Sequence, residues 1–175
     1  MLFCLIGHSS SGKSTIEKEL NQKGYERLIS YTTRSPRKNE INGLDYHYIS
    51  EEEFKELQSE GFFHEVAKYR EWYYGISLDG IDLDEEIYIA VVTVHGYEEL
   101  SKHTDKIIAI HIKVDERERI IRQLNRGDEV DEVMRRINTD REDFKNVEIA
   151  CHYIVENDNL ESSINKVEEI IKQHS

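Results

Sequence analysis

Short apolar stretches alternate along the chain with segments whose apolar residues recur every three or four positions. The continuously apolar stretches at 2–6, 87–94 and 107–112 predict strands that are buried on both faces. Two shorter strands are expected at 27–29 and 153–155. Because helical patterns separate these strands, the sequence predicts an α/β protein with a parallel five-stranded sheet.

The helical segments each have one apolar face. The segment after the first strand carries Ile16 and Leu20 on one side and ends at Gly24, and a short helix is expected from about Gly96. The last segment predicts a closing helix that packs through one side. Its apolar positions are Leu160, Ile164, Val167 and Ile171.

A small lobe that differs from the alternating strands and helices of the core is expected between the second and third core strands. Its helix begins with a capping box at Ser50 and Glu53 and would bury Phe54 and Leu57. Three short strands are expected around this helix, at 46–49, 62–67 and 71–76. The pattern therefore predicts a small mixed α/β lobe inserted into the core.

An arginine-rich region follows the strand at 107–112. Seven arginines lie between Arg117 and Arg141 on two helical patterns, which are interrupted at 126–128. Asp128 is the expected N-cap of the second helix. The apolar positions of that helix are Val130, Val133, Met134, Ile137 and Phe144.

The strongest chemical signal is the stretch at 7–14, which fits G-x-x-x-x-G-K-[ST] directly after the first strand. Gly7 and Gly12 let backbone N–H groups turn toward phosphate oxygens, Lys13 places a cation on the β- and γ-phosphates, and Ser14 offers a hydroxyl to Mg²⁺. The alternative is an ordinary Gly/Ser turn between a strand and a helix. The predicted ATP-binding residues of the loop are Gly7, Ser9, Ser10, Ser11, Gly12, Lys13, Ser14 and Thr15.

The composition and net charge limit the classes of molecule that the chain is expected to bind. The chain has 175 residues, enough for one domain, and a net charge of −13, which argues against a nucleic-acid polymer or an anionic membrane. A nucleotide remains suitable, because it needs only a local cluster of Arg and Lys. Cys4 and Cys151 are expected to be buried thiols, the scattered histidines indicate no structural metal, and the apolar N-terminal run is too short for a signal peptide. We therefore expect a cytoplasmic protein.

Transfer of a phosphoryl group between nucleotides needs two polyanions held close together and shielded from water. The enzyme needs a phosphate-binding loop, a second cationic site for the acceptor, and arginines that cover the transferring group. The sequence offers Lys13, the pair Arg34 and Arg37, and the arginine-rich region.

The chain resembles guanylate kinases over nearly its whole length. The resemblance rests on Ser-Tyr-Thr-Thr-Arg-Ser-Pro-Arg at 30–37, Asn-Gly-Leu-Asp-Tyr at 42–46, Glu65, and Tyr-Tyr-Gly at 73–75. It implies a single domain with a core of the kind found in P-loop nucleoside monophosphate kinases. The implied parts are a core at 1–30, 87–114 and 142–175, a GMP-binding lobe at 31–86, and a helical arginine-rich lid at 115–141.

The resemblance also implies an activity: ATP-dependent phosphorylation of GMP, and of dGMP, by direct in-line transfer, with Mg²⁺ as cofactor. Ser30 would donate to guanine O6, and Glu65 would accept from N1–H and the 2-amino group. The implied catalytic residues are Lys13, Arg126 and Arg136, and Asn157 would lie near the adenine of ATP. The full implied GMP site is Ser30, Arg34, Arg37, Tyr46, Glu65, Tyr74 and Thr93.

The sequence departs from the family pattern at the end of the strand at 87–94. Guanylate kinases typically have Asp-x-Asp there, where this chain has Val91 and Thr93, and Ile76 replaces a serine of the acceptor site. The acidic segment at 79–86 is shorter than the family's helix. Its candidates for the missing acids are Asp79, Asp82 and Asp84.

Two alternatives to a guanylate kinase remain open. One is a kinase of the same fold with a different phosphorylated acceptor, which the intact Ser30 and Glu65 disfavour. The other is a non-catalytic binding module, which the complete phosphate loop disfavours. Oligomeric state is not predicted.

Overall fold

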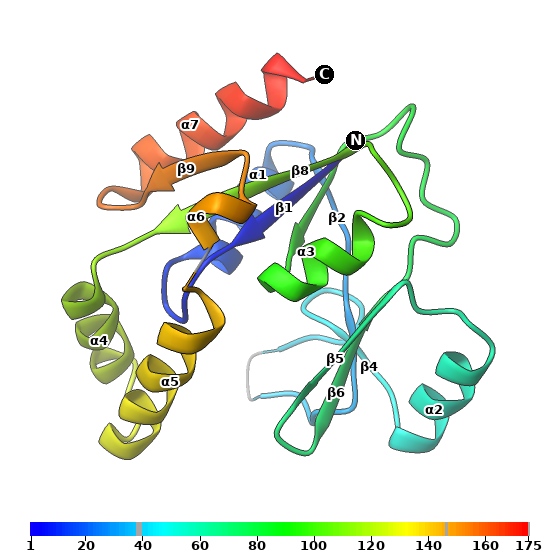
Figure 1. Ribbon diagram of the computed structural model, residues 1–175, viewed down its shortest axis with the longest axis horizontal. Helices are drawn as coiled ribbons and strands as arrows, with labels where there is room; N and C mark the ends of the chain where they lie inside the picture. The colour runs from blue at the N-terminus through cyan, green and yellow to red at the C-terminus, as the bar shows by residue number, and fades with distance from the viewer. Residues whose placement is uncertain (38–39, 146, 175) are drawn as a thin grey trace.

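The computed structural model describes residues 1–37, 40–145 and 147–174, and its core is a five-stranded parallel sheet (Figure 1). Each strand pairs in parallel with its neighbours, so the carboxyl ends of all five meet at one edge. The strand order is β2 (Glu26–Arg27), β7 (Tyr88–Val91), β1 (Leu2–Ile6), β8 (Ile107–Lys113) and β9 (Tyr153–Glu156). The predicted fold class and sheet are confirmed.

Strand β1 is central and fully buried, because helices cover both faces of the sheet. Leu2, Cys4 and Ile6 point to one face, where they join an apolar cluster that includes residues of α3 and α6. Phe3 and Leu5 point to the other face and pack with α1 and α7. These helices are α1 (Lys13–Gln22), α3 (Val94–Leu100), α6 (Val147–Ala150) and α7 (Leu160–Gln173).

A second, four-stranded sheet lies below the carboxyl edge of the first in Figure 1. Helix α2 (Glu51–Ser59) packs against it through Phe54, which stacks on Phe63 and Tyr73 with ring centroids 4.5 and 5.4 Å apart. The capping box of Ser50 and Glu53 is present as predicted. The strand order is β4 (His47–Tyr48), β3 (Tyr31–Thr32), β6 (Trp72–Ile76) and β5 (Glu65–Tyr69).

Helices α4 (Glu116–Asn125) and α5 (Val130–Asp143) project beyond the core beside the second sheet (Figure 1). On α5, Val133 and Ile137 are buried as the spacing predicts, but Val130 and Met134 are exposed. This helix pair extends away from the main sheet, so Val130 and Met134 lie at the surface. Leu160, at the start of α7, is also exposed.

Several predicted boundaries were wrong because side chains near them are used differently. The strand expected at 87–94 ends at Val91, since the Thr93 hydroxyl caps α3 by accepting from Gly96 N at 2.9 Å. Asp128 is not the N-cap of α5: Glu129 holds that position, and the Asp128 carboxylate binds Arg136 instead. The short strands differ in extent from expectation, with bounds of Glu26–Arg27, His47–Tyr48, Glu65–Tyr69 and Trp72–Ile76.

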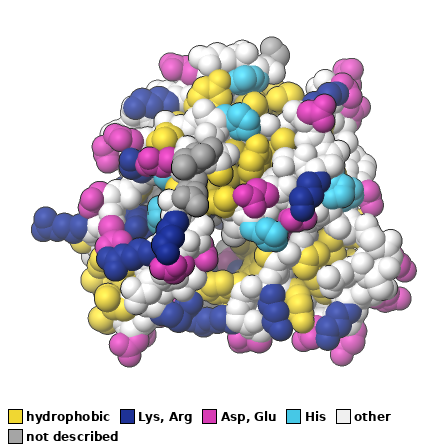
Figure 2. Space-filling view, in the orientation of Figure 1, with side chains coloured by type: hydrophobic (Ala, Val, Ile, Leu, Met, Phe, Trp, Pro, Cys, Tyr) yellow, Lys and Arg dark blue, Asp and Glu magenta, His cyan; other side chains and the backbone are white. Residues whose placement is uncertain are grey.

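The surface is strongly charged, with both signs mixed. Figure 2 shows acidic and basic side chains interspersed around one face of the molecule. None of the helices among the described residues has the length and apolar character needed to cross a membrane. Both cysteines are free thiols; Cys4 is buried, whereas Cys151 is only half-buried.

Strand β8, which lies between β1 and β9, gives a test of the fold. Ile110 is fully buried on the face covered by α1 and α7. We expect Ile110→Ala to lower the free energy of unfolding by about 3 kcal/mol, because the shorter side chain leaves a cavity between the sheet and the helices α1 and α7 that cover it. Ile41→Ala, at a position 57% exposed, should change it by less than about 0.5 kcal/mol. Urea denaturation measures both, and equal effects would contradict this packing.

Candidate functional site

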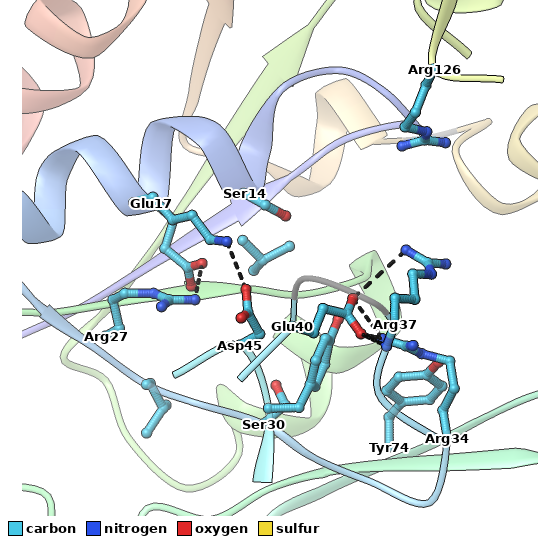
Figure 3. Close-up of a pocket in the computed structure, with 14 residues that line it drawn as sticks. Ser14, Glu17, Arg27, Ser30, Arg34, Arg37, Glu40, Asp45, Tyr74 and Arg126 are labelled. Atoms are coloured by element: carbon cyan, nitrogen blue, oxygen red, sulfur yellow. Dashed lines mark hydrogen bonds and ion pairs between the residues drawn. The ribbon is translucent and has the colours of Figure 1, made fainter. Parts of the chain in front are cut away.

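Two adjoining cavities lie at the carboxyl edge of the parallel sheet, where ligands bind in open α/β folds. Their volumes are about 540 and 310 Å³, and Ser30, Tyr46, Tyr74 and Val91 line both. The larger cavity reaches between the second sheet and α1 (Figure 3), and the smaller one reaches toward the loop after β1 and α5. A molecule in one cavity would therefore lie next to a molecule in the other.

The loop after β1 curls around its own lysine. Gly12 has a φ of 96°, and Lys13 Nζ donates to the carbonyls of Gly7 at 2.5 Å and His8 at 3.0 Å. Burial lowers the pKa of Lys13 to about 8, and the Asp140 carboxylate opposes this shift. The loop thus places a cation at its mouth, where an anion would relieve the cost of burying the charge.

The loop is held from behind by side chains from two other elements. Asn157, just after β9, donates from Nδ2 to Ser11 O at 2.8 Å. Asp140 of α5 accepts from Ser9 N at 2.8 Å and from Ser9 Oγ at 3.2 Å. Asn157 is only 3% exposed, so the structure places it behind the loop, and it lines neither cavity.

The opposite wall of the larger cavity carries a buried arginine with a fixed orientation. Arg34 is 8% exposed and donates from Nη2 to both oxygens of Glu40, at 3.0 and 2.9 Å. Its guanidinium lies 5.5 Å from the ring of Tyr46 and 5.8 Å from that of Tyr48. Arg37, by contrast, is 66% exposed, and its side chain extends over the cavity (Figure 3).

Glu40 joins the two arginines of this wall. Its carboxylate accepts from Arg37 N at 2.7 Å and from the Tyr48 hydroxyl at 2.8 Å. Burial works to raise the pKa of Glu40, but the hydrogen bonds from Arg37 N, Tyr48 and Arg34 outweigh it and hold the pKa below its usual range. An ionised Glu40 therefore keeps the wall assembled.

A buried carboxylate lines the smaller cavity. Glu65, at the start of β5, is 6% exposed and, among the described residues, has no hydrogen-bond partner for its side chain. Burial, with a smaller contribution from Glu99, raises the pKa of Glu65 to about 7. Thr93 and the backbone of Gly96 lie beside it, since a Cβ on Gly96 would be 3.1 Å from Glu65 Oε1. The carboxylate is free to accept from a ligand.

Two arginines of the α4–α5 region face the cavities. Arg126 lines the larger cavity and Arg136 the smaller, and both bind Asp128. Figure 3 shows Arg126 across the cavity from Arg34 and Arg37. Arg136 also donates to Glu132 Oε1 at 2.8 Å.

Helix α5 also touches the second sheet through charged and polar groups. Arg135 donates to the Tyr69 hydroxyl and to Glu132, which also binds Arg70. Hydrogen bonds from Arg135 and Arg136 lower the pKa of Glu132 to about 2 despite the opposing effect of burial. These contacts join α5, on one side of the cleft, to the end of β5 and the turn that follows it, on the other side.

The structure brings most of the predicted site residues together. Ser10, Gly12 and Thr15 line a neighbouring hollow on the outer side of the loop, together with Arg122. Ser11, which is part of the same loop, is fully buried. The predicted residues that line the two cavities are Gly7, Ser9, Lys13, Ser14, Ser30, Arg34, Arg37, Tyr46, Glu65, Tyr74, Thr93, Arg126 and Arg136.

The acidic segment at 79–86 does not reach this site. Asp82 and Asp84 line a separate cavity, and Asp84 pairs there with Lys106. Asp79 lies 4.0 Å from His64, outside both cavities of the site. None of these candidate acids lines the two cavities, because their segment packs through Leu78, Ile81 and Leu83 against the apolar cluster of the main sheet.

Several contributors to the site were not predicted, among them Glu40, Arg119 and Asp140. Glu40 follows a basic stretch, which gives a weak local signal for an arginine partner. Asp140 lies four residues after Arg136, hence on the same helical face, and this spacing could have indicated a place at the site. Arg119 gave no signal, because its pairing depends on the fold.

Magnesium is compatible with the residues present. Within the described ranges, no group of three or more His, Cys, Asp or Glu could hold a metal ion by itself. Mg²⁺ accompanying a nucleotide needs few protein ligands, because phosphate oxygens and water fill most of its positions. The exposed Ser14 hydroxyl lines the larger cavity at the start of α1 and suits that role.

Comparisons with known proteins all indicate the same protein family. The family model described as guanylate kinase matches residues 1–174. A guanylate kinase from Chlamydia muridarum (strain MoPn / Nigg) is 35% identical over 170 residues, covering 91% of this chain and 80% of that protein. One from Helicobacter pylori (strain ATCC 700392 / 26695) is 34% identical over 169 residues, covering 93% and 82%.

A solved structure gives the same fold. The crystal structure of guanylate kinase from Anaplasma phagocytophilum superposes with a TM-score of 0.79 at 21% identity. The match covers 99% of this chain and 85% of that one. The overall α/β fold of this chain is therefore shared with a solved guanylate kinase.

Gly12 offers a test of the loop. A Cβ at Gly12 would lie 2.4 Å from Asn157 Nδ2, whereas one at Gly80, which also has positive φ, would meet nothing within 4 Å. Both Gly→Ala variants should lose about 1–2 kcal/mol of stability to the left-handed backbone. Only Gly12→Ala should also weaken binding of a fluorescent ATP analogue, by about tenfold or more, because the N–H cradle is displaced. Equal affinities in the two variants would contradict the assignment.

Proposed function

The chain belongs to the guanylate kinase family, and we propose that it transfers the terminal phosphate of ATP to GMP, and to dGMP, by direct in-line displacement. One observation carries the proposal: two cationic sites face each other across adjoining cavities, and a buried carboxylate lies beside one of them. An enzyme that joins two polyanions needs this arrangement, since each phosphate must be held against the repulsion of the other.

The acceptor binds along the second sheet. Arg34 and Arg37 take the phosphate of GMP, with the hydroxyls of Tyr46 and Tyr74 as further donors. Because Glu40 already orients Arg34, the guanidinium needs little reorganisation on binding. The segment at 31–86 serves as the acceptor-binding lobe.

Glu65 recognises the base. An ionised carboxylate matches the two adjacent donors of guanine, N1–H and the 2-amino group, whereas adenine presents an acceptor at N1. Ser30 lines both cavities, where its hydroxyl can donate to O6. Thr93 contributes less than the family's acids, because its Oγ1 already accepts from Gly96 N. Selectivity therefore rests mainly on Glu65.

The donor binds at the loop after β1. Backbone N–H groups of the loop and the start of α1 hold the phosphates of ATP, and Lys13 turns from the Gly7 and His8 carbonyls to the β- and γ-phosphates. Mg²⁺, held by Ser14 and the nucleotide, supplies charge neutralisation when bound. Arg126 and Arg136, on the lid at 115–141, cover the transferring group and exclude water. No side-chain base is needed, because the attacking phosphate oxygen is already ionised.

The two alternatives are less well supported. A different acceptor would leave the buried Glu65 carboxylate without its two donors, which is costly. A binding module would not need the complete loop with its half-buried lysine. Since both substrates are cytoplasmic metabolites, we propose the cytoplasm as the place of action; the net charge of −13 disfavours nucleic acid as a partner.

An acceptor panel tests the activity. ADP release should be coupled to GMP and dGMP but not to AMP, CMP or UMP at equal concentration. Lys13→Ala should lower kcat about a hundredfold or more, because the charge on the transferring phosphate loses its nearest cation. Lys166→Ala, which removes an exposed lysine on α7, should not change it. ATP binding without turnover of any acceptor would overturn the proposal in favour of a binding module.

The raised pKa of Glu65 predicts pH-dependent use of GMP. Below pH 7 the carboxyl becomes protonated and no longer accepts from both guanine donors. KM for GMP should therefore rise by about tenfold from about pH 8 to about pH 6. Glu65→Gln should have a high KM at every pH without this extra rise, and it controls for titration of the GMP phosphate. A parallel rise in both proteins would contradict the role of Glu65.

A further inference from the structure

A buried carboxylate behind the phosphate loop is outside the roles described so far. Asp140 is 6% exposed, and both of its oxygens are used: Oδ2 accepts from Ser9 N at 2.8 Å and Oδ1 from Ser9 Oγ at 3.2 Å. Oδ2 also accepts from Arg119 Nη1 at 3.1 Å. The side chain thus joins α4, α5 and the loop at one point.

The residue held by Asp140 belongs to the half of the loop that faces the terminal phosphate. Lys13, which reaches the β- and γ-phosphates in such loops, has its Nζ at the carbonyls of Gly7 and His8, the neighbours of Ser9. The other half, next to the N-terminus of α1, is anchored separately through Ser11 and Asn157. The two halves therefore have independent supports.

The ion pair by itself gives a weak reason for burying these charges. Arg119 is 3% exposed, and its Nε has no partner among the described residues. Burying two charges costs desolvation that their attraction often fails to offset, so an apolar pair at these positions could be equally stable. What an apolar pair could not do is accept the two hydrogen bonds from Ser9.

We propose that Asp140 is a positioning residue for phosphoryl transfer, which holds Ser9 so that the first half of the loop keeps the shape that receives the terminal phosphate of ATP. This inference rests on the proposed function. Asp140 and Arg136 lie one turn apart on α5, and both line the smaller cavity. The same helix therefore fixes the loop through Asp140 and covers the transferring group through Arg136.

Two double variants separate this role from that of a structural ion pair. Arg119→Met with Asp140→Asn, and Arg119→Met with Asp140→Ala, both lack the ion pair. In the first, the amide oxygen still accepts from Ser9 N and the amide nitrogen can donate to Ser9 Oγ; in the second, both hydrogen bonds are lost. Asp131→Asn, at an exposed position on α5, controls for the loss of one negative charge.

With GMP as acceptor, the Ala double variant should lose kcat by about tenfold or more, and the Asn double variant should keep most of it. KM for GMP should stay within about twofold in both, because the acceptor wall is untouched. Thermal unfolding should show both variants folded with similar midpoints. Equal kcat in the two double variants, whether high or low, would overturn the proposal.

A nucleotide-binding measurement tests the role of Asp140 independently of whether the protein phosphorylates GMP. Displacement of a fluorescent nucleotide should show ATP affinity reduced about tenfold in the Ala double variant, with ADP affinity changed by less than about threefold and the Asn double variant close to wild type. If the wild type fails to phosphorylate GMP, the proposed function falls, but this ATP-specific loss still supports the role of Asp140. Equal losses of ATP and ADP affinity would overturn it.

Discussion

Electrostatic pairing within the site is the constraint on which the rest of the structure depends. On the proposed function, an acidic chain with a net charge of −13 must bind two polyanions side by side, and the arginines around its cleft are already paired with carboxylates. The pairing lets several cations gather around the cleft without mutual repulsion and fixes their orientation. The pairs are Arg34 and Arg37 with Glu40, Arg126 and Arg136 with Asp128, and Arg119 with Asp140.

These pairs differ in what a substrate phosphate can do to them. Arg34 is buried and held by both oxygens of Glu40, so it acts as a fixed donor, whereas Arg37 and Arg126 are more than half exposed and can turn toward an incoming phosphate. An exposed arginine can exchange its carboxylate partner for phosphate at little cost, because ion pairs of exposed side chains are weak. On the proposed function, the buried arginines therefore shape the cleft, and the exposed arginines close over the substrates.

Local sequence signals were sufficient for the fold class and for most of the site, since each depends on neighbours in the chain. The continuous apolar run at 2–6 predicted the central strand, and the spacing of Gly7, Gly12 and Lys13 predicted the loop. The wrongly predicted boundaries involve polar side chains that could form either of two kinds of contact. Thr93 caps a helix and ends a strand early, and Asp128 serves two arginines instead of a helix end. The contact of Asp140 with Ser9 spans 131 residues, and no local pattern encodes it.

The central claim is that donor and acceptor bind side by side in this cleft, with the donor phosphates at the loop after β1 and the acceptor phosphate at Arg34 and Arg37. Isothermal titration with adenosine and guanosine joined through five phosphates tests it most directly, because the compound spans both cavities only if they are so placed. It should bind at least about a hundredfold more tightly than ATP or GMP alone and compete with both. An affinity no better than that of ATP, or competition with only one of the two nucleotides, would contradict direct transfer in this cleft.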